Sequence, residues 1–287
     1  MSLVGKLARA IRHPWQVHPG RVFEHFWTRI VSLTFVEALA WDKLERPWLA
    51  YGVMQAALQA KALGIPAISV VEVGVAGGNG LVLLEQYAER VERATSVRCR
   101  VMGFDTGEGL PKPVDYRDLP YIWQPGSFRM DVERLKKRLR RAQLILGNVA
   151  QTGPNAMAAD GVPPIGFVSF DLDFYSSTME AFRLLEQAPD RLLPRVFCYL
   201  DDCIGDDWEL HSEFAGELLA VNDFNRAHPA RKIAPIYGLR HKRHRAAAWN
   251  DMMFVMHCFE HPRYNDHVHP NRDWHLPLKS ESASGSG

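Results

Sequence analysis

From residue 68 onwards, short runs of apolar residues alternate with amphipathic segments. Runs of this length, rich in β-branched residues and bounded by glycine or charged residues, predict buried β-strands. Five such runs come in succession and two more follow near the C-terminus: 68–74, 98–105, 142–147, 164–171, 195–202, 232–238 and 251–259. The segments between them carry apolar residues at helical spacing: 79–92, 131–141, 177–188 and 208–226. We expect the helix at 177–188 to begin with a capping box formed by Ser177 and Glu180.

Strands that alternate with helices, and that are apolar almost throughout, indicate a mostly parallel sheet covered by helices on both faces. The predicted fold class is therefore α/β, with a Rossmann-like, doubly wound sheet of seven strands. Helical patterns over 21–41 and 46–64 precede the sheet. We predict an N-terminal helical extension over 1–65, a Rossmann-like domain over 66–262, and a C-terminal tail over 263–287 whose Ser- and Gly-rich end has the composition of disorder.

The balance of positive and negative charge argues against nucleic acid as a partner. There are 34 Lys and Arg residues against 33 Asp and Glu, a net charge of +1, so no global field attracts a polyanion such as nucleic acid. We interpret the basic runs at 135–141 and 240–245 as a solvated helix face and a loop. The 4 cysteines do not form a disulfide framework in a chain of 287 residues, and we expect a reducing, cytoplasmic location.

No apolar stretch reaches the roughly 20 residues of a membrane-spanning helix, and the N-terminus has no signal-peptide pattern. Residues 3–15 form a short, basic, amphipathic segment, which we expect to pack against the domain or a partner subunit. Aromatic residues in the helical extension fit a homo-oligomer, although packing within the chain explains them equally well: Phe23, Phe26, Trp27, Phe35 and Trp41.

The turn after the first strand is rich in glycine. Gly74, Gly77, Gly78 and Gly80 lie between a strand and a helix, where glycine lets the backbone come close to a ligand. In open α/β sheets, ligands bind beyond the carboxyl ends of the strands, which is where this turn falls. The spacing differs from the G-x-G-x-x-G pattern of dinucleotide-binding folds.

Two acids accompany this turn. Glu72 lies inside the first strand, at a position that is usually apolar in NAD-binding folds. Asp105 ends the second strand, from which a carboxylate can accept both ribose hydroxyls of a nucleoside bound over the turn. A role of Asp105 as a turn former is the alternative.

Further acids follow the fourth and fifth strands, which we expect to be neighbours. Asp171 and Asp173 come after one, and Asp201 and Asp202 after the other. Carboxylates this close repel one another unless a positive charge lies between them, and a hard divalent cation with oxygen ligands would supply it. Unrelated loop acids are the alternative. Asp173 could accept a proton if the strand continues, or cap the next helix if the chain turns.

Taken in order, four motifs carry a resemblance: E-x-G at 72–74 with its glycine-rich turn, GFDTGEGLP at 103–111, DLDFYSST at 171–178 and the strand-ending DD at 201–202. Together they resemble the class I S-adenosylmethionine-dependent methyltransferases, and more narrowly the macrocin O-methyltransferase (TylF-like) group. The likeness spans about half of the chain. It implies methyl transfer from S-adenosylmethionine to a sugar hydroxyl of a natural product, with Mg²⁺ as a cofactor.

The resemblance and the residues together give the candidate site. Asp171, Asp201 and Asp202 match the group's metal ligands, and Asp173 its proposed base. His211, just past the acid pair, is a second candidate base. We assign cofactor binding to the residues at the ends of the first three strands: Glu72, Gly74, Ala76, Gly77, Gly78, Asn79, Asp105 and Asn148.

Other interpretations stay open. The aromatic loop at 113–131, with Tyr116, Tyr121 and Trp123, could form a lid, an acceptor wall or ordinary packing. The histidine-rich segment at 257–275 lacks zinc-ligand spacing and is interpreted as a surface tail. The competing functions are a metal-independent methyltransferase acting on nitrogen or a carboxylate, a non-catalytic binding protein on the same scaffold and, more distantly, an NAD-dependent oxidoreductase.

Overall fold

The computed structural model describes residues 33–269. The chain divides into two compact units, Met1–Glu45 and Arg46–Gly287. Helix α3 (Phe35–Ala40), in the first unit, begins with a capping box between Thr34 and Glu37. The predictions for residues 3–15, for Phe23, Phe26 and Trp27, and for the end of the tail lie outside the described residues.

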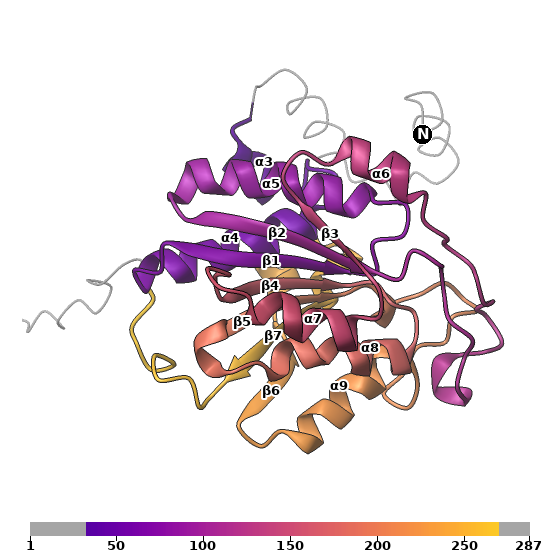
Figure 1. The fold of residues 1–287 in the computed structure, drawn as a ribbon. Coiled ribbons are helices and arrows are strands. Elements are labelled where there is room, and N and C mark those ends of the chain that lie inside the picture. The colour runs from indigo at the N-terminus through magenta and orange to yellow at the C-terminus, as the bar shows by residue number, and fades with distance from the viewer. Residues whose placement is uncertain (1–32, 270–287) are drawn as a thin grey trace, which may run out of the picture. The chain divides into compact units, whose positions relative to one another are not determined.

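The second unit contains a seven-stranded sheet in the order β3-β2-β1-β4-β5-β7-β6 (Figure 1). Strand β7 is antiparallel to both of its neighbours, β5 and β6, and the other pairs are parallel. The strands are β1 (Ala67–Val73), β2 (Arg98–Asp105), β3 (Gln143–Leu146), β4 (Ile165–Phe170), β5 (Leu192–Leu200), β6 (Arg231–Pro235) and β7 (Met253–Cys258). All seven predicted strands are confirmed, and with them the predicted fold class.

Helices cover both faces of this sheet (Figure 1). Helices α4 (Pro47–Ala62) and α5 (Asn79–Thr95) pack on one face, and α4, which the sequence pattern placed in the N-terminal extension, contacts β4 and β5. The opposite face carries α7 (Val149–Ala158), α8 (Tyr175–Ala181) and α9 (Gly216–Ala227). The short helices are α6 (Val132–Arg138) and α10 (Leu239–Lys242). Among the helices of residues 33–269, none is both long and apolar enough to cross a membrane.

Tight packing fixes strand β4 between the two helical layers. On the α4 side, a Cβ at Gly52 would come within 2.2 Å of the Phe167 ring, so glycine is required there. On the other side, the Phe170 ring meets Phe182 edge-on at 5.1 Å between centroids, and Phe182 meets Phe224 of α9 at 5.4 Å. The carboxyl end of β4 is therefore held from both faces, which makes it a rigid support for side chains that follow it.

Three helix predictions need correction. Helix α7 was not predicted, because Gly153 and Pro154 lie inside it and both residues disfavour a helix. Helix α8 begins at Tyr175 without a side-chain cap, and Glu180 bonds to Asn148 instead of completing a capping box. Helix α9 begins at Gly216, eight residues later than the predicted 208, because residues 208–215 form turns and a short bridge.

Candidate active site

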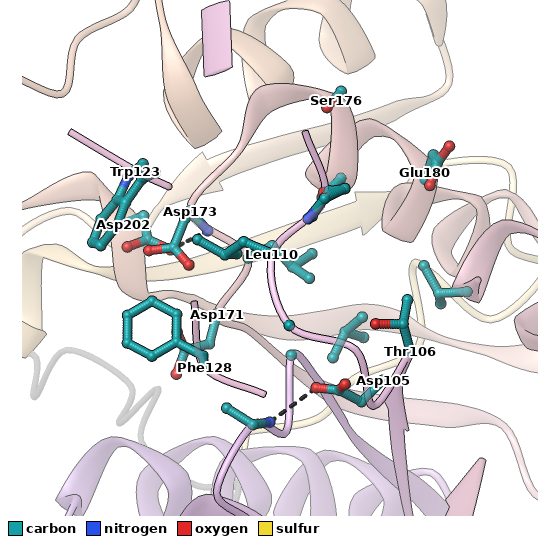
Figure 2. Close-up of a pocket in the computed structure, with 18 of the residues that line it drawn as sticks. Asp105, Thr106, Leu110, Trp123, Phe128, Asp171, Asp173, Ser176, Glu180 and Asp202 are labelled. Atoms are coloured by element: carbon teal, nitrogen blue, oxygen red, sulfur yellow. Dashed lines mark hydrogen bonds between the residues drawn. The ribbon is translucent and has the colours of Figure 1, made fainter. Parts of the chain in front are cut away.

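A cavity of about 610 Å³ opens at the carboxyl ends of the parallel strands. In Figure 2, Asp105 and Thr106 lie together on one side of it, and Asp173, Asp202 and Trp123 on the other. The cavity is lined from the ends of β1, β2, β4 and β5 and from the loop after β2. This is the position at which an open α/β sheet binds ligands, as the sequence predicted.

Asp105 organises the first side of the cavity. One carboxylate oxygen accepts the backbone N–H groups of Val75 and Ala76 at 2.8 and 2.9 Å, and the other accepts that of Gly107 at 2.6 Å. A carboxylate has about four acceptor positions, so about one is left for a ligand hydroxyl. The turn-forming role is therefore present, and the geometry leaves room for one ribose hydroxyl rather than two.

Gly74 and Ala76 line the cavity beside Asp105. Gly74 has φ +85°, and a Cβ there would lie 1.8 Å from the backbone oxygen of Asp171. The ends of β1 and β4 can approach this closely only because residue 74 has no side chain. Ala76 has φ 44°, a left-handed conformation that Asp105 stabilises through the Ala76 N–H group.

The rest of the glycine turn lies beside the cavity lining. Arg138 of α6 donates to the Gly77 carbonyl at 3.1 Å and to the Asn79 side chain at 2.7 Å. A Cβ at Gly78 would lie 2.2 Å from Leu135. Helix α6 therefore covers this part of the turn, and a cofactor contact by Gly77, Gly78 or Asn79 stays a prediction.

Glu72 lies beneath the turn rather than in the cavity lining. Its side chain is buried, and a Cβ at Gly80 would come within 1.8 Å of its carboxylate. Burial, together with the charge of Asp171, raises the pKa of Glu72 well above its ordinary value. A direct contact of Glu72 with a cofactor likewise stays a prediction.

Asn148 closes this side of the cavity. It is the N-cap of α7, where its side-chain oxygen accepts the Ala150 N–H at 2.7 Å. Its side-chain nitrogen donates to Glu180 at 2.7 Å, and both residues line the cavity. The predicted cofactor residues Gly74, Ala76, Asp105 and Asn148 are thus brought together around one space.

The acids that follow β4 and β5 line the other side: Asp171, Asp173, Asp201 and Asp202. Tyr199 donates its hydroxyl to Asp201 at 2.7 Å, and Asp202 accepts the backbone N–H of Asp173 at 2.7 Å. Burial, followed by the charges of Asp201 and Asp202, raises the pKa of Asp171 well above its ordinary value. Burial also raises the pKa of Asp202 to about 7, against the effect of its hydrogen bond from Asp173.

Asp173 is held in a conformation that neither sequence alternative foresaw. Strand β4 ends at Phe170, and the residue at the N-cap of α8 is Phe174, so Asp173 neither continues the strand nor caps the helix. Its φ is +61°, and the Phe174 N–H donates to the Leu172 carbonyl at 2.6 Å, which closes a three-residue γ-turn. A turn of this type is rare and strained. It directs Asp173 towards the cavity (Figure 2).

The electrostatic state of Asp173 follows from its surroundings. Its side chain is 6% exposed, and burial raises its pKa to about 9, with further contributions from Asp202 and Asp171. The buried acids extend behind it to Glu217, which accepts the Asp202 N–H at 3.1 Å. Burial raises the pKa of Glu217 well above its ordinary value as well. No sequence signal marks Glu217, because it lies in the first turn of α9 and has no notable spacing to the acid pair.

His211 is placed differently from the other candidates. It is not among the lining residues, its side chain is 2% exposed, and its Nε2 lies 3.7 Å from Glu209, which does line the cavity. Burial lowers the pKa of His211, and Glu209 opposes that effect. A catalytic role for His211 would have to act through Glu209 and stays a prediction.

An aromatic wall faces the acids. Trp123 and Phe128 line the cavity and meet edge-on with 5.9 Å between ring centroids (Figure 2). Of the aromatic residues predicted for this loop, Tyr116 and Tyr121 are exposed and lie outside the lining. Phe128 was not singled out from the sequence, because an aromatic residue between Ser127 and Arg129 resembles any exposed loop position.

One buried residue fastens the start of this loop to helix α8. Asp118 is fully buried and accepts the Ser176 N–H and hydroxyl at 2.8 and 2.9 Å. It also accepts the Val114 N–H at 2.8 Å. The loop that carries the aromatic wall is therefore tied to the helix that follows Asp173.

The fold brings the three predicted metal ligands to the same edge of the sheet, but their side chains are not arranged to bind one metal ion together. Asp171, Asp201 and Asp202 line the same cavity, and burial, followed by the charges of the other two, raises the pKa of Asp171. Across residues 33–269, however, no group of three or more His, Cys, Asp or Glu side chains is arranged to hold a metal ion. The donor chemistry fits a hard cation, whereas the side-chain arrangement would have to change for it.

The likeness to known proteins lies in the fold rather than in the sequence. No protein-family model matches the sequence, and no curated protein matches it. The structure of the calicheamicin methyltransferase CalS11 is similar with a TM-score of 0.50 and 21% identity, over 76% of this chain and 81% of that one. The strand order 3-2-1-4-5-7-6 with an antiparallel β7 is that of the class I methyltransferases. The chain has the class I methyltransferase fold.

The predicted resemblance to class I methyltransferases is thus confirmed at the level of the fold. Two further structures are similar to a lower degree. The O-methyltransferase NovP is 15% identical over 72% of this chain and 78% of its own, with a TM-score of 0.49. The O-methyltransferase TomG of Streptomyces achromogenes, involved in tomaymycin synthesis, is 16% identical over 83% and 96%, with a TM-score of 0.42.

Proposed function

We propose that this protein is an S-adenosylmethionine-dependent O-methyltransferase that methylates a hydroxyl group of a sugar or a glycosylated small molecule. The observation that carries the proposal is one cavity with two chemically different sides. One side has Gly74, Ala76 and Asp105, suited to an adenosine group, and the other has the acids that follow β4 and β5. A methyl donor bound on the first side would point its reactive group at an acceptor on the second.

The acceptor side has the chemistry that recognises a sugar. The Trp123 and Phe128 rings supply an apolar wall on which the carbon face of a sugar ring can pack. Asp171, Asp173 and Asp202 supply acceptors for hydroxyl groups. An acceptor from natural-product chemistry also agrees with the similarity to CalS11, which is a calicheamicin methyltransferase.

The proposed reaction is a direct displacement. The acceptor oxygen attacks the methyl carbon in line with the carbon–sulfur bond, the sulfur keeps the bonding electrons, and the hydroxyl proton passes to Asp173. The products are a methyl ether, S-adenosylhomocysteine and a proton. Positioning accounts for much of the rate in such a step, and the γ-turn at Asp173 would position the base on the acceptor side. The positive sulfonium favours the ionised form of nearby carboxylates.

Binding of S-adenosylhomocysteine tests the cofactor half of this proposal. At a concentration 100 times its dissociation constant, a ligand stabilises the native state by about 2.7 kcal/mol, which is about 5–10 °C in melting temperature for a domain of this size. We expect a shift of that size with S-adenosylhomocysteine and none with NAD. A shift with NAD alone would favour an oxidoreductase, and saturable binding without methyl transfer to any glycoside would favour the non-catalytic alternative.

We further propose that Mg²⁺ assists the reaction, held by Asp171, Asp201 and Asp202. The gathering of three carboxyl groups at one edge of the cavity supports this, because a divalent cation would favour their ionised forms. When bound, Mg²⁺ would orient two acceptor oxygens and make the hydroxyl more acidic.

Removal of metal tests that step. We expect EDTA treatment to lower the methyl-transfer rate by about 10-fold or more, and added Mg²⁺ to restore it. Asp202→Asn should not be restored by Mg²⁺, and calorimetric titration of Mg²⁺ should show weaker binding to this variant. Full activity in EDTA would instead support a metal-independent methyltransferase, for which nitrogen or carboxylate acceptors should then be assayed.

A further inference from the structure

Arg46 has an unusual place at the start of helix α4. It is the N-cap residue, with φ 44° and ψ 61°, and Pro47 follows it as the first helical residue. A residue before proline normally adopts an extended backbone, and a non-glycine residue in the left-handed region is strained. Such a conformation persists where the surrounding structure holds it, and it often marks a functional position.

The side chain of Arg46 belongs to the cavity. Arg46 lines the cavity together with Gly74, which follows β1, and Asp171, which follows β4. Its positive charge also lowers the pKa of Glu72, against the larger effect of burial.

The charge balance of the cavity makes this cation distinctive. The lining includes seven carboxylates, whereas Arg46 and Lys112 are its cationic side chains in the described part of the chain. Lys112 is exposed on the loop after β2, whereas Arg46 is half-buried at the strand ends. Among the described lining residues, a negatively charged ligand group would find a positive side chain only at these two positions.

S-adenosylmethionine has one such group. Its amino-acid part carries an α-carboxylate as well as an α-ammonium, and the sulfonium adds a positive charge. Adenosine beside Asp105 and a methyl group directed at Asp173 (Figure 2) account for two of the three groups on the sulfonium sulfur. The third group, the amino-acid part, would then extend towards other lining residues, among which are Gly74 and Arg46. The acids of the cavity suit the two cationic groups of the cofactor, and the carboxylate needs a cation of its own.

We infer that Arg46 binds the α-carboxylate of S-adenosylmethionine and so selects the amino-acid end of the cofactor. This inference rests on the proposed function. A guanidinium can bind a carboxylate through two parallel hydrogen bonds, which fixes orientation as well as adding affinity. This role would explain why the strained backbone at Arg46 is retained, since that conformation directs the side chain towards the strand ends.

Calorimetry with two ligands tests the inference. Decarboxylated S-adenosylmethionine differs from S-adenosylmethionine only in lacking the carboxylate, so the ratio of their dissociation constants isolates the contact. We expect Arg46→Gln to weaken S-adenosylmethionine binding by about 10- to 100-fold. Binding of the decarboxylated ligand should stay within about twofold of the native protein or become tighter. Arg46→Lys keeps the charge and should retain part of the preference.

The outcomes separate the inference from the function on which it rests. If the native protein binds neither ligand, the proposed function fails and the inference with it. If the native protein binds both but Arg46→Gln weakens them equally, or weakens neither, only the inference is overturned. If Lys112→Gln instead of Arg46→Gln removes the preference, the carboxylate binds at Lys112 and the inference is wrong. Melting curves check that each variant is folded, and Arg46→Asn, which tolerates the left-handed backbone, replaces Arg46→Gln if that variant is not.

Discussion

Asp173→Asn is expected to lower kcat for methyl transfer by about 10²–10⁴-fold, the usual contribution of a positioned proton acceptor. The amide has nearly the same shape as the carboxylate but does not accept a proton from a hydroxyl group. Asparagine also tolerates the positive φ of 61° at this position, so the γ-turn should survive the change. Single-turnover kinetics with a glycoside acceptor would measure the effect on the chemical step.

The affinity for S-adenosylhomocysteine should be unchanged in Asp173→Asn, since Asp173 lies on the acceptor side of the cavity (Figure 2). Asp207→Asn is the matched control, because Asp207 is an exposed acid a few residues past the pair and does not line the cavity. If both variants keep their full rate, Asp173 is not the base. Proton transfer would then have to use Asp202 or the Glu209–His211 pair.

Gly74→Ala is expected to destabilise the protein by about 2–5 kcal/mol, since a left-handed backbone disfavours alanine and the new methyl group overpacks the site. The methyl group would meet the backbone oxygen of Asp171 at 1.8 Å, and a backbone atom cannot turn aside as a side chain can. The ends of β1 and β4 would have to separate. Urea denaturation would measure the loss in the free energy of unfolding, and cofactor affinity should fall in parallel.

Gly64→Ala distinguishes strain from steric conflict in this prediction. Gly64 has a similar φ of +67°, but no heavy atom lies within 4 Å of a Cβ built there. It should therefore cost only the backbone term, about 1–2 kcal/mol. Equal losses in the two variants would contradict the close contact between the β1 and β4 ends.

The sheet could be predicted from the sequence because each central strand is buried on both faces and therefore appears as an uninterrupted apolar run. Helix α7 was missed because its sequence contains Gly153 and Pro154, whose local preferences oppose the helix that packing favours. The position of the candidate site followed from topology, since parallel strands bring their carboxyl ends to one edge.

The finer geometry of the site could not be predicted in this way. The γ-turn after Phe170 is supported by a tertiary contact, because the Asp173 N–H donates to the Asp202 carboxylate at another strand end. Glu217 and Arg46 take part through contacts with other elements of the fold, and neither lies in a recognisable motif. Local sequence patterns therefore identified the acids that follow the strands but not the residues that the fold brings to them.

The hydrogen bonds of Asp118 separate the part of the loop that fixes its position from the part that faces the acceptor, so the two parts can evolve independently. Its hydrogen bonds to Ser176 and Val114 fix the root of the loop, while the rings that face the cavity, Trp123 and Phe128, lie several residues further on. Substitutions and length changes between that root and α6 can reshape the surface offered to an acceptor without moving the strand ends. A scaffold built in this way can acquire a new acceptor by changing one loop, with the methyl-donor side left as it is.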